Sequence, residues 1–172
     1  MTQYANFRAF FHWRRSGKWL LILCWSTGLL FGNAVATNAG EFLVPMMRSA
    51  VSAPVSILGL LAAAVLPFLI SAYAVSISEP WLLLIISTLK AFGFSFSACA
   101  VSLAFGQSSW LVRFLFLFSD HCVMPLLWLY WLRHISGEKA FSLQEMACFI
   151  AAAVVIGWMD YFMISPFLAA LI

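Results

Sequence analysis

Five long apolar runs determine what this chain can fold into. Each is close to the roughly 20 residues that an α-helix needs to cross a bilayer core of about 30 Å. Of all residues 65% are hydrophobic and 9% are charged, whereas soluble domains have about 25% charged residues. The sequence therefore predicts an all-α fold, a polytopic transmembrane helical bundle that forms a single domain over residues 1–172. The predicted spans are residues 19–36, 55–77, 81–105, 110–132 and 146–168.

The segments on either side of the first run carry further signals. Residues 1–18 interleave arginine and lysine with aromatic residues, which is typical of an amphipathic segment on an anionic membrane surface or of an anchor that only sets topology. The run at 19–36 also resembles a secretory signal peptide, but its length favours a signal anchor that is retained. Residues 37–54 contain two prolines and stay apolar, which predicts a short amphipathic helix along the outer interface.

Lysine and arginine are distributed unevenly over the connections between the runs. One side of the predicted bundle has only Arg48. The other side has six basic residues: Arg8, Arg14, Arg15, Lys18, Arg133 and Lys139. Because basic residues are retained on the cytoplasmic side, the N-terminus is predicted to be cytoplasmic, and five crossings then put the C-terminus outside.

Charged and titratable side chains interrupt the apolar runs at five positions: Lys90, Arg113, Asp120, His121 and Asp160. A charge at the bilayer centre costs about 3 kcal/mol on insertion scales, so it is normally paired or lines a polar cavity. At about 1.5 Å per residue, Lys90 lies about 13 Å from the inner end of its run and Asp120 about 15 Å from the outer end of the next. These depths match, and so do those of Arg113 and Asp160. We therefore expect the pairs Lys90–Asp120 and Arg113–Asp160, unless Arg113 extends outwards and leaves Asp160 to water or Tyr161.

His121 follows Asp120 directly, and a histidine beside an acid inside a membrane can relay protons. Neighbouring residues on a helix point about 100° apart, so the two form one site only if Pro125 distorts the backbone. A metal site at His121 and Cys122 lacks a second group of ligands at helical spacing. The cysteines are expected to be small buried side chains of the apolar runs. They are Cys24, Cys99, Cys122 and Cys148.

Motifs for catalysis and cofactor binding are missing from the sequence. It contains no GxxxxGK[ST], HExxH, GxSxG or CxxC, which are the signatures of nucleotide binding, zinc hydrolysis, serine hydrolysis and thiol chemistry. We therefore predict no cofactor, no metal and no catalytic residue. A nucleic-acid partner is not expected either, because the basic residues stand where they set membrane orientation.

Three glycines are candidates for helix packing. Gly28 and Gly32 stand four residues apart, a spacing that lets another helix approach closely, within this chain or in a second one. Residues 81–105 would extend about 37 Å as one helix, beyond a hydrocarbon core of about 30 Å, so this helix tilts or breaks. Gly93 is the predicted breaking point.

Several of these features occur in an order similar to that of a known family. The first run ends in the element Gly28-Leu29-Leu30-Phe31-Gly32, and the long connection leads to Lys90-Ala91-Phe92-Gly93-Phe94-Ser95-Phe96. A glycine turn at Phe105-Gly106 and a run with Pro125 follow. Over residues 28–133, about two thirds of the chain, this order resembles the stage II sporulation protein M family of small multi-span bacterial membrane proteins. Ala91 and Ser95 replace glycines of that pattern, and Asp120-His121 replaces a more neutral stretch.

This resemblance implies a noncatalytic scaffold or accessory subunit of a multiprotein complex in the bacterial inner (plasma) membrane. Its contacts would be the lipid bilayer and partner membrane proteins or a second copy, and the charges would be static contacts between helices. The alternative is a small transporter or transport subunit with a midplane polar site at Lys90, Asp120 and His121, because such sites use buried charge and broken helices. A third interpretation is a membrane-embedded enzyme with a polar site at Asp120, His121 and Asp160.

Overall fold

The computed structural model describes residues 13–53, 55–77, 79–106, 110–135 and 142–171. Every element of regular secondary structure in these ranges is a helix, so the predicted all-α fold is confirmed for them. Most of the predicted amphipathic segment at residues 1–18, namely residues 1–12, lies outside the described ranges.

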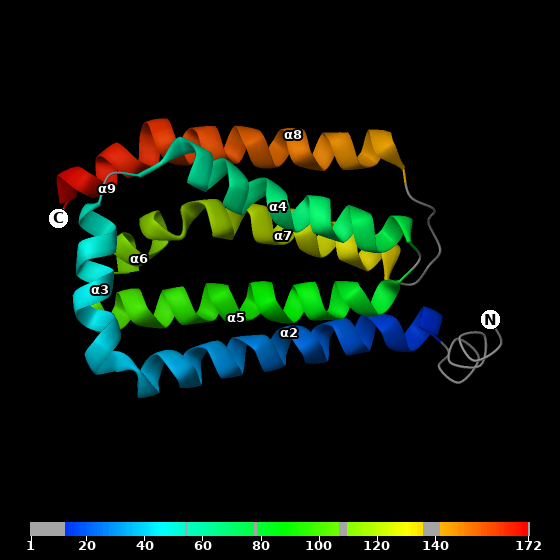
Figure 1. Ribbon diagram of the computed structural model, residues 1–172, viewed down its shortest axis with the longest axis horizontal. Helices are drawn as coiled ribbons and strands as arrows, with labels where there is room; N and C mark the ends of the chain where they lie inside the picture. Colours follow the sequence, from blue (N-terminus) through cyan, green and yellow to red (C-terminus); the bar gives the residue numbers. More distant parts are fainter. Residues whose placement is uncertain (1–12, 54, 78, 107–109, 136–141, 172) are drawn as a thin grey trace.

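The helices form a bundle that is elongated along one direction (Figure 1). Successive passes of the chain run along this bundle axis in alternating directions, and α3 lies across one end (Figure 1). In chain order the elements are α2 (Trp13–Asn38), α3 (Gly40–Ser52), α4 (Ile57–Ser76), α5 (Pro80–Phe105), α6 (Trp110–Phe116), α7 (Phe118–His134), α8 (Leu143–Met159), η1 (Asp160–Ile164) and α9 (Ser165–Leu171). The chain therefore passes along the bundle five times, with α6–α7 as the fourth pass and α8–η1–α9 as the fifth.

Within the described ranges, four stretches of helix are long and apolar enough to cross a membrane. They are Ser16–Asn38, Ile57–Ser76, Trp81–Phe105 and Leu143–Ala170. α6 and α7 pass the same test as a pair, but they are bent by 61° relative to each other. Large apolar side chains such as Leu58, Leu89 and Phe162 are exposed on the outside of the bundle, which is compatible with a multi-pass membrane protein.

α2 and α5 run parallel to each other and touch through their backbones. A Cβ atom added at Gly28 would overlap the carbonyl oxygen of Thr88, and one added at Gly32 would overlap that of Phe92. Ser95 Oγ donates a hydrogen bond to Leu29 O across the same contact at 2.7 Å. The GxxxG spacing is thus used within this chain, where it allows two helix axes to approach closely.

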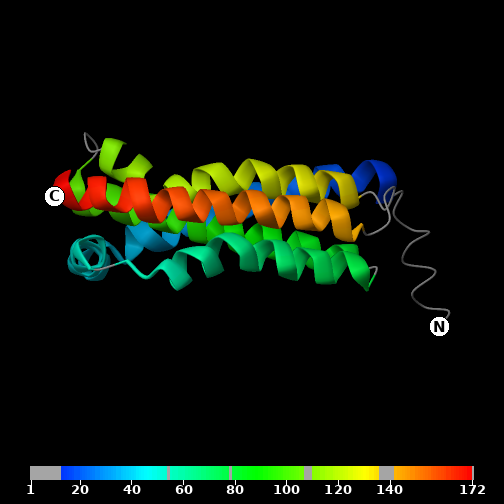
Figure 2. The ribbon, with the colours of Figure 1, turned by 90° about the horizontal axis from the view of Figure 1, so that it is seen from above.

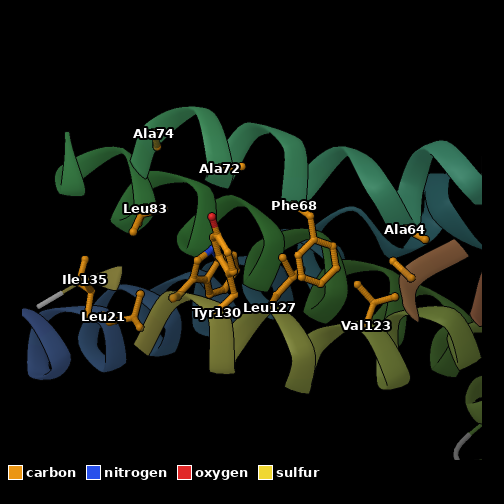
Figure 3. Close-up of a cluster of buried hydrophobic side chains, with 12 residues drawn as sticks. Leu21, Ala64, Phe68, Ala72, Ala74, Leu83, Val123, Leu127, Tyr130 and Ile135 are labelled. Atoms are coloured by element: carbon orange, nitrogen blue, oxygen red, sulfur yellow. The ribbon is translucent and has the colours of Figure 1, made fainter. Parts of the chain in front are cut away.

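The main apolar core lies where α2, α4, α5, α7 and α8 meet. Figure 3 shows Phe68 of α4 and Tyr130 of α7 pointing toward each other in this core. Their rings are 6.3 Å apart and nearly perpendicular, a favourable aromatic geometry. Trp131 is completely buried and its indole N–H donates to Ser71 Oγ at 2.8 Å. This polar contact joins α7 to α4 inside the core.

The predicted break at Gly93 is wrong, because α5 continues through it from Pro80 to Phe105. A Cβ atom at Gly93 would meet no atom within 4 Å, so the residue faces open space. A glycine inside a helix costs only about 1 kcal/mol, which the contact with α2 along the helix offsets. The break occurs instead in the fourth pass, at Leu117 between α6 and α7.

The predicted helix in the long connection corresponds to α3, which lies across the end of the bundle (Figure 1). Leu43 packs against Ala36 and Ala100. The guanidinium of Arg48 donates to Ala104 O through Nε at 3.3 Å and Nη2 at 3.2 Å. These bonds satisfy a carbonyl of the last turn of α5, which has no partner within its own helix.

Candidate functional site

The candidate site is the break in the fourth pass. Leu117 has φ −102° and ψ 15°, outside the helical range, and α7 restarts at Phe118. The first N–H groups of a helix lack carbonyl partners and carry a partial positive charge equivalent to about half a proton. The break therefore places a positive helix end inside the bundle, with exposed apolar helices around it.

Lys90 of α5 reaches this helix end and forms an ion pair with Asp120. Lys90 Nζ lies 2.5 Å from Asp120 Oδ1, as expected from the matched depths. Asp120 belongs to the first turn of α7, where a carboxylate is stabilised by the positive end of the helix. The two side chains are 17% and 28% exposed, so the pair is largely closed off by the helices around it.

Asp160 is the second carboxylate of the site. It is 5% exposed and begins η1, a π-helical turn that contacts α7 and α4. The backbone N–H of Ser119, in the first turn of α7, lies near its carboxylate. Such π-turns interrupt α-helices and often occur at functional sites. Here the turn brings a buried acid to the free N–H groups of a broken helix.

The predicted pair Arg113–Asp160 is wrong. Arg113 is exposed, and its Nη1 donates to Ser102 Oγ of α5 at 3.3 Å. Among the described residues, Asp160 takes part in no ion pair. The physical reason is the 61° bend, which directs α6 away from α7, so that residues on α6 and on the fifth pass no longer match by depth alone.

The charges of the site nearly cancel. Lys90 contributes one positive charge, Asp120 and Asp160 two negative charges, and the start of α7 about half a positive charge. A buried acid without a cationic side chain is costly in apolar surroundings. The helix end therefore takes the role that the sequence had suggested for an arginine.

His121 lies beside the ion pair but points elsewhere. Its Nδ1 lies 2.8 Å from the carbonyl oxygen of Leu117 and must be the protonated nitrogen, since a carbonyl oxygen only accepts. The imidazole ring lies between Phe94 and Phe114, 5.2 Å from each ring centre. Asp120 and His121 thus face different neighbours, and the structure does not bring them together as a relay.

Residues missed by the sequence analysis are Leu117 and Ser119. Ser119 Oγ is buried and has no hydrogen-bond partner in the described part of the chain. A signal for the break was present, because Ser119 and Asp120 are residue types that favour the start of a helix. The uninterrupted apolar run around them concealed it.

The titratable side chains of the site are few. Over the described ranges no group of three or more histidine, cysteine, aspartate or glutamate residues could hold a metal ion. The four cysteines are free, and Cys148 is exposed while the other three are partly buried. The site holds one ion pair, Lys90–Asp120, and one buried acid, Asp160.

Comparisons of the chain with protein-family models, with curated proteins and with solved structures found no match.

Proposed function

We propose that this chain is a multi-pass protein of the bacterial inner (plasma) membrane that acts as a noncatalytic scaffold or accessory subunit of a membrane complex. The apolar exterior and the five passes support a bilayer location. The bias of lysine and arginine toward the end where α2 begins supports a cytoplasmic N-terminus and an outer C-terminus. At the opposite end of the bundle, the described residues include two arginines, Arg48 and the exposed Arg113.

The observation that carries the scaffold proposal is the closed contact between Lys90 and Asp120. A transport site needs its charged groups to be accessible to a substrate or ion during part of the cycle. Here the lysine nitrogen and the carboxylate oxygen are in direct contact at 2.5 Å and mostly covered. A charge pair of this kind joins α5 to α7 and fixes the geometry of the bundle, as a scaffold requires.

α3 supplies a surface for a partner. Phe42 and Met46 stand one helical turn apart and are 80% and 59% exposed, while Leu43 of the same helix faces the bundle. This apolar face lies at the end of the bundle that the proposal places outside. We infer that a partner membrane protein, or a second copy, packs against it.

The scaffold proposal is tested with affinity-tagged full-length protein, crosslinked in its own membrane and purified. The double variant Phe42→Ser/Met46→Ser should lose the crosslinked partner and keep the melting temperature of the parent. Leu58→Ser is the matched control, because Leu58 is also strongly exposed but lies on α4. Equal loss of the partner in both variants would contradict a specific role for α3.

The second candidate is transport of protons or small ions, favoured by the broken fourth pass and by the buried Asp160 of the fifth pass, which lies beside the break. Half-helices that begin inside a membrane are used by transporters to bind charged groups. Purified protein in liposomes with an entrapped pH-sensitive dye separates the two candidates. A scaffold gives no proton flux above that of empty liposomes, whereas flux that Lys90→Met abolishes in a correctly folded protein would favour transport.

A further inference from the structure

A groove between α7 and α8 is separate from the polar site. The two helices lie side by side (Figure 2), and the groove follows their shared face near the end of the bundle where α2 begins. It is lined by Leu126, Arg133, Ser142, Gln144, Glu145, Cys148, Phe149 and Ala152. Seven residues of the two helices, together with Ser142 before α8, thus line a shallow, open groove on the flank of the bundle.

The lining changes from polar to apolar along the groove. Arg133, Gln144 and Glu145 lie at the end of the bundle, and Leu126, Phe149 and Ala152 lie further toward its middle. The lining on α8 extends from Ser142 to Ala152, which is about 15 Å along a helix. Half of a hydrocarbon core of about 30 Å has the same length. The gradient therefore matches one leaflet of a bilayer, with the polar end at its surface.

Arg133 provides the charge at the polar end. Its Nη1 contacts Glu145 Oε1 at 2.7 Å, and the arginine side chain is 50% exposed while that of the glutamate is 13% exposed. The less exposed carboxylate thus anchors a half-exposed guanidinium at the edge of the groove. A guanidinium has five N–H donors in a planar fork that fits phosphate oxygens, so donors remain on its exposed side.

We propose that this groove binds one phospholipid of the cytoplasmic leaflet, with the phosphate at Arg133 and an acyl chain along Leu126, Phe149 and Ala152. The assignment rests on the proposed membrane location. It is supported by the charge complementarity between guanidinium and phosphate and by the apolar continuation of the groove. Gln144 lines the same polar end of the groove.

The test is native mass spectrometry of the purified full-length protein with added phosphatidylglycerol. The parent should retain one lipid, and Arg133→Gln should lower the retained fraction about tenfold, the effect of one lost charge-assisted contact. Arg113→Gln is the matched control, because that arginine is exposed on the same pass at the opposite end. Diacylglycerol with the same acyl chains lacks the phosphate and should not be retained.

A second pair of variants tests the groove without changing the Arg133–Glu145 ion pair. Cys148→Phe should fill the groove and displace the lipid, whereas Ala151→Phe, at an exposed position of α8 outside the groove, should not. Equal retention by Arg133→Gln and the parent, or retention of diacylglycerol, would overturn the lipid site. Alkaline extraction of membranes distinguishes the two proposals: release of the protein overturns the membrane location, while a protein that stays but binds no lipid overturns only the groove.

Discussion

The α2–α5 contact and the contact of α7 with the fifth pass hold helices together by different means. α2 and α5 are continuous and touch through backbone atoms at Gly28 and Gly32. The fourth pass is broken at Leu117 and the fifth contains a π-helical turn at Asp160. At this contact, polar side chains and the unpaired backbone N–H groups at the start of α7 link the two passes.

These two contacts show two ways in which helices can associate where the burial of apolar surface contributes little free energy. In a bilayer, lipid tails are as apolar as leucine, so helices associate through close packing and polar contacts. Small residues give close packing only while both helices stay regular. A broken helix loses that regularity but gains free backbone donors, to which acids such as Asp160 can bind.

The largest expected effect comes from Gly32→Leu. Its side chain would overlap the Phe92 carbonyl oxygen, a backbone atom that moves only if the helices separate. We expect a loss of about 3 kcal/mol, the upper range for overpacked positions. Thermal unfolding of the purified protein in detergent measures it.

Gly93→Leu is the control for that substitution, because a Cβ atom at Gly93 meets nothing within 4 Å. Its stability should be equal to that of the parent or slightly higher, since glycine is a poor helix former. If the two leucine variants unfold at the same temperature, the α2–α5 contact does not depend on backbone approach.

The next largest effect is expected at the ion pair that joins α5 to the first turn of α7. Lys90→Met leaves the Asp120 carboxylate without its partner and should cost about 2 kcal/mol, below the roughly 3–5 kcal/mol of fully buried pairs, because both groups are partly exposed. Lys90→Met/Asp120→Asn removes both charges and should recover most of the loss. A double variant that is as unstable as the sum of the single variants would show that the two residues act independently.

Much of this contrast could be predicted from the sequence. The apolar runs indicated the helices, and the glycine spacing indicated a close contact in α2. Matching depths along regular helices placed Lys90 beside Asp120. All three inferences use only the rise and the periodicity of a continuous helix.

The other features of the site depend on where a helix is interrupted. That position could not be derived from the local sequence pattern. Gly93 is the weaker helix former, yet α5 stays intact because α2 packs along it. Leu117 is a good helix former, yet the fourth pass breaks there, where Asp160 lies near the start of α7 and Lys90 pairs with Asp120 in its first turn. Arg113 then contacts Ser102 in place of Asp160, a consequence of tertiary structure that overrides propensity.

Two substitutions of Asp160, with smaller expected losses of stability, distinguish the contribution of its charge from that of its hydrogen-bond acceptor. Asp160→Asn keeps an oxygen that can accept from the Ser119 N–H, and it removes a negative charge close to Asp120, so stability should stay within about 0.5 kcal/mol. Asp160→Leu removes the acceptor and should cost about 1 kcal/mol, as for a lost helix cap. Chemical unfolding curves of the two variants measure the difference, and a larger loss for the asparagine variant would mean that the charge itself is required.

The smallest effect concerns the polar contact in the apolar core between α4 and α7. Ser71→Ala leaves the buried Trp131 N–H without its acceptor and should cost about 0.6 kcal/mol, the average for hydrogen bonds between helices in a membrane protein. Ser87→Ala is the matched control, since that hydroxyl is equally buried but donates only to Leu84 O of its own helix. Near-ultraviolet circular dichroism of the tryptophan bands during thermal unfolding follows both variants. Equal midpoints would show that side-chain packing alone holds α7 against α4.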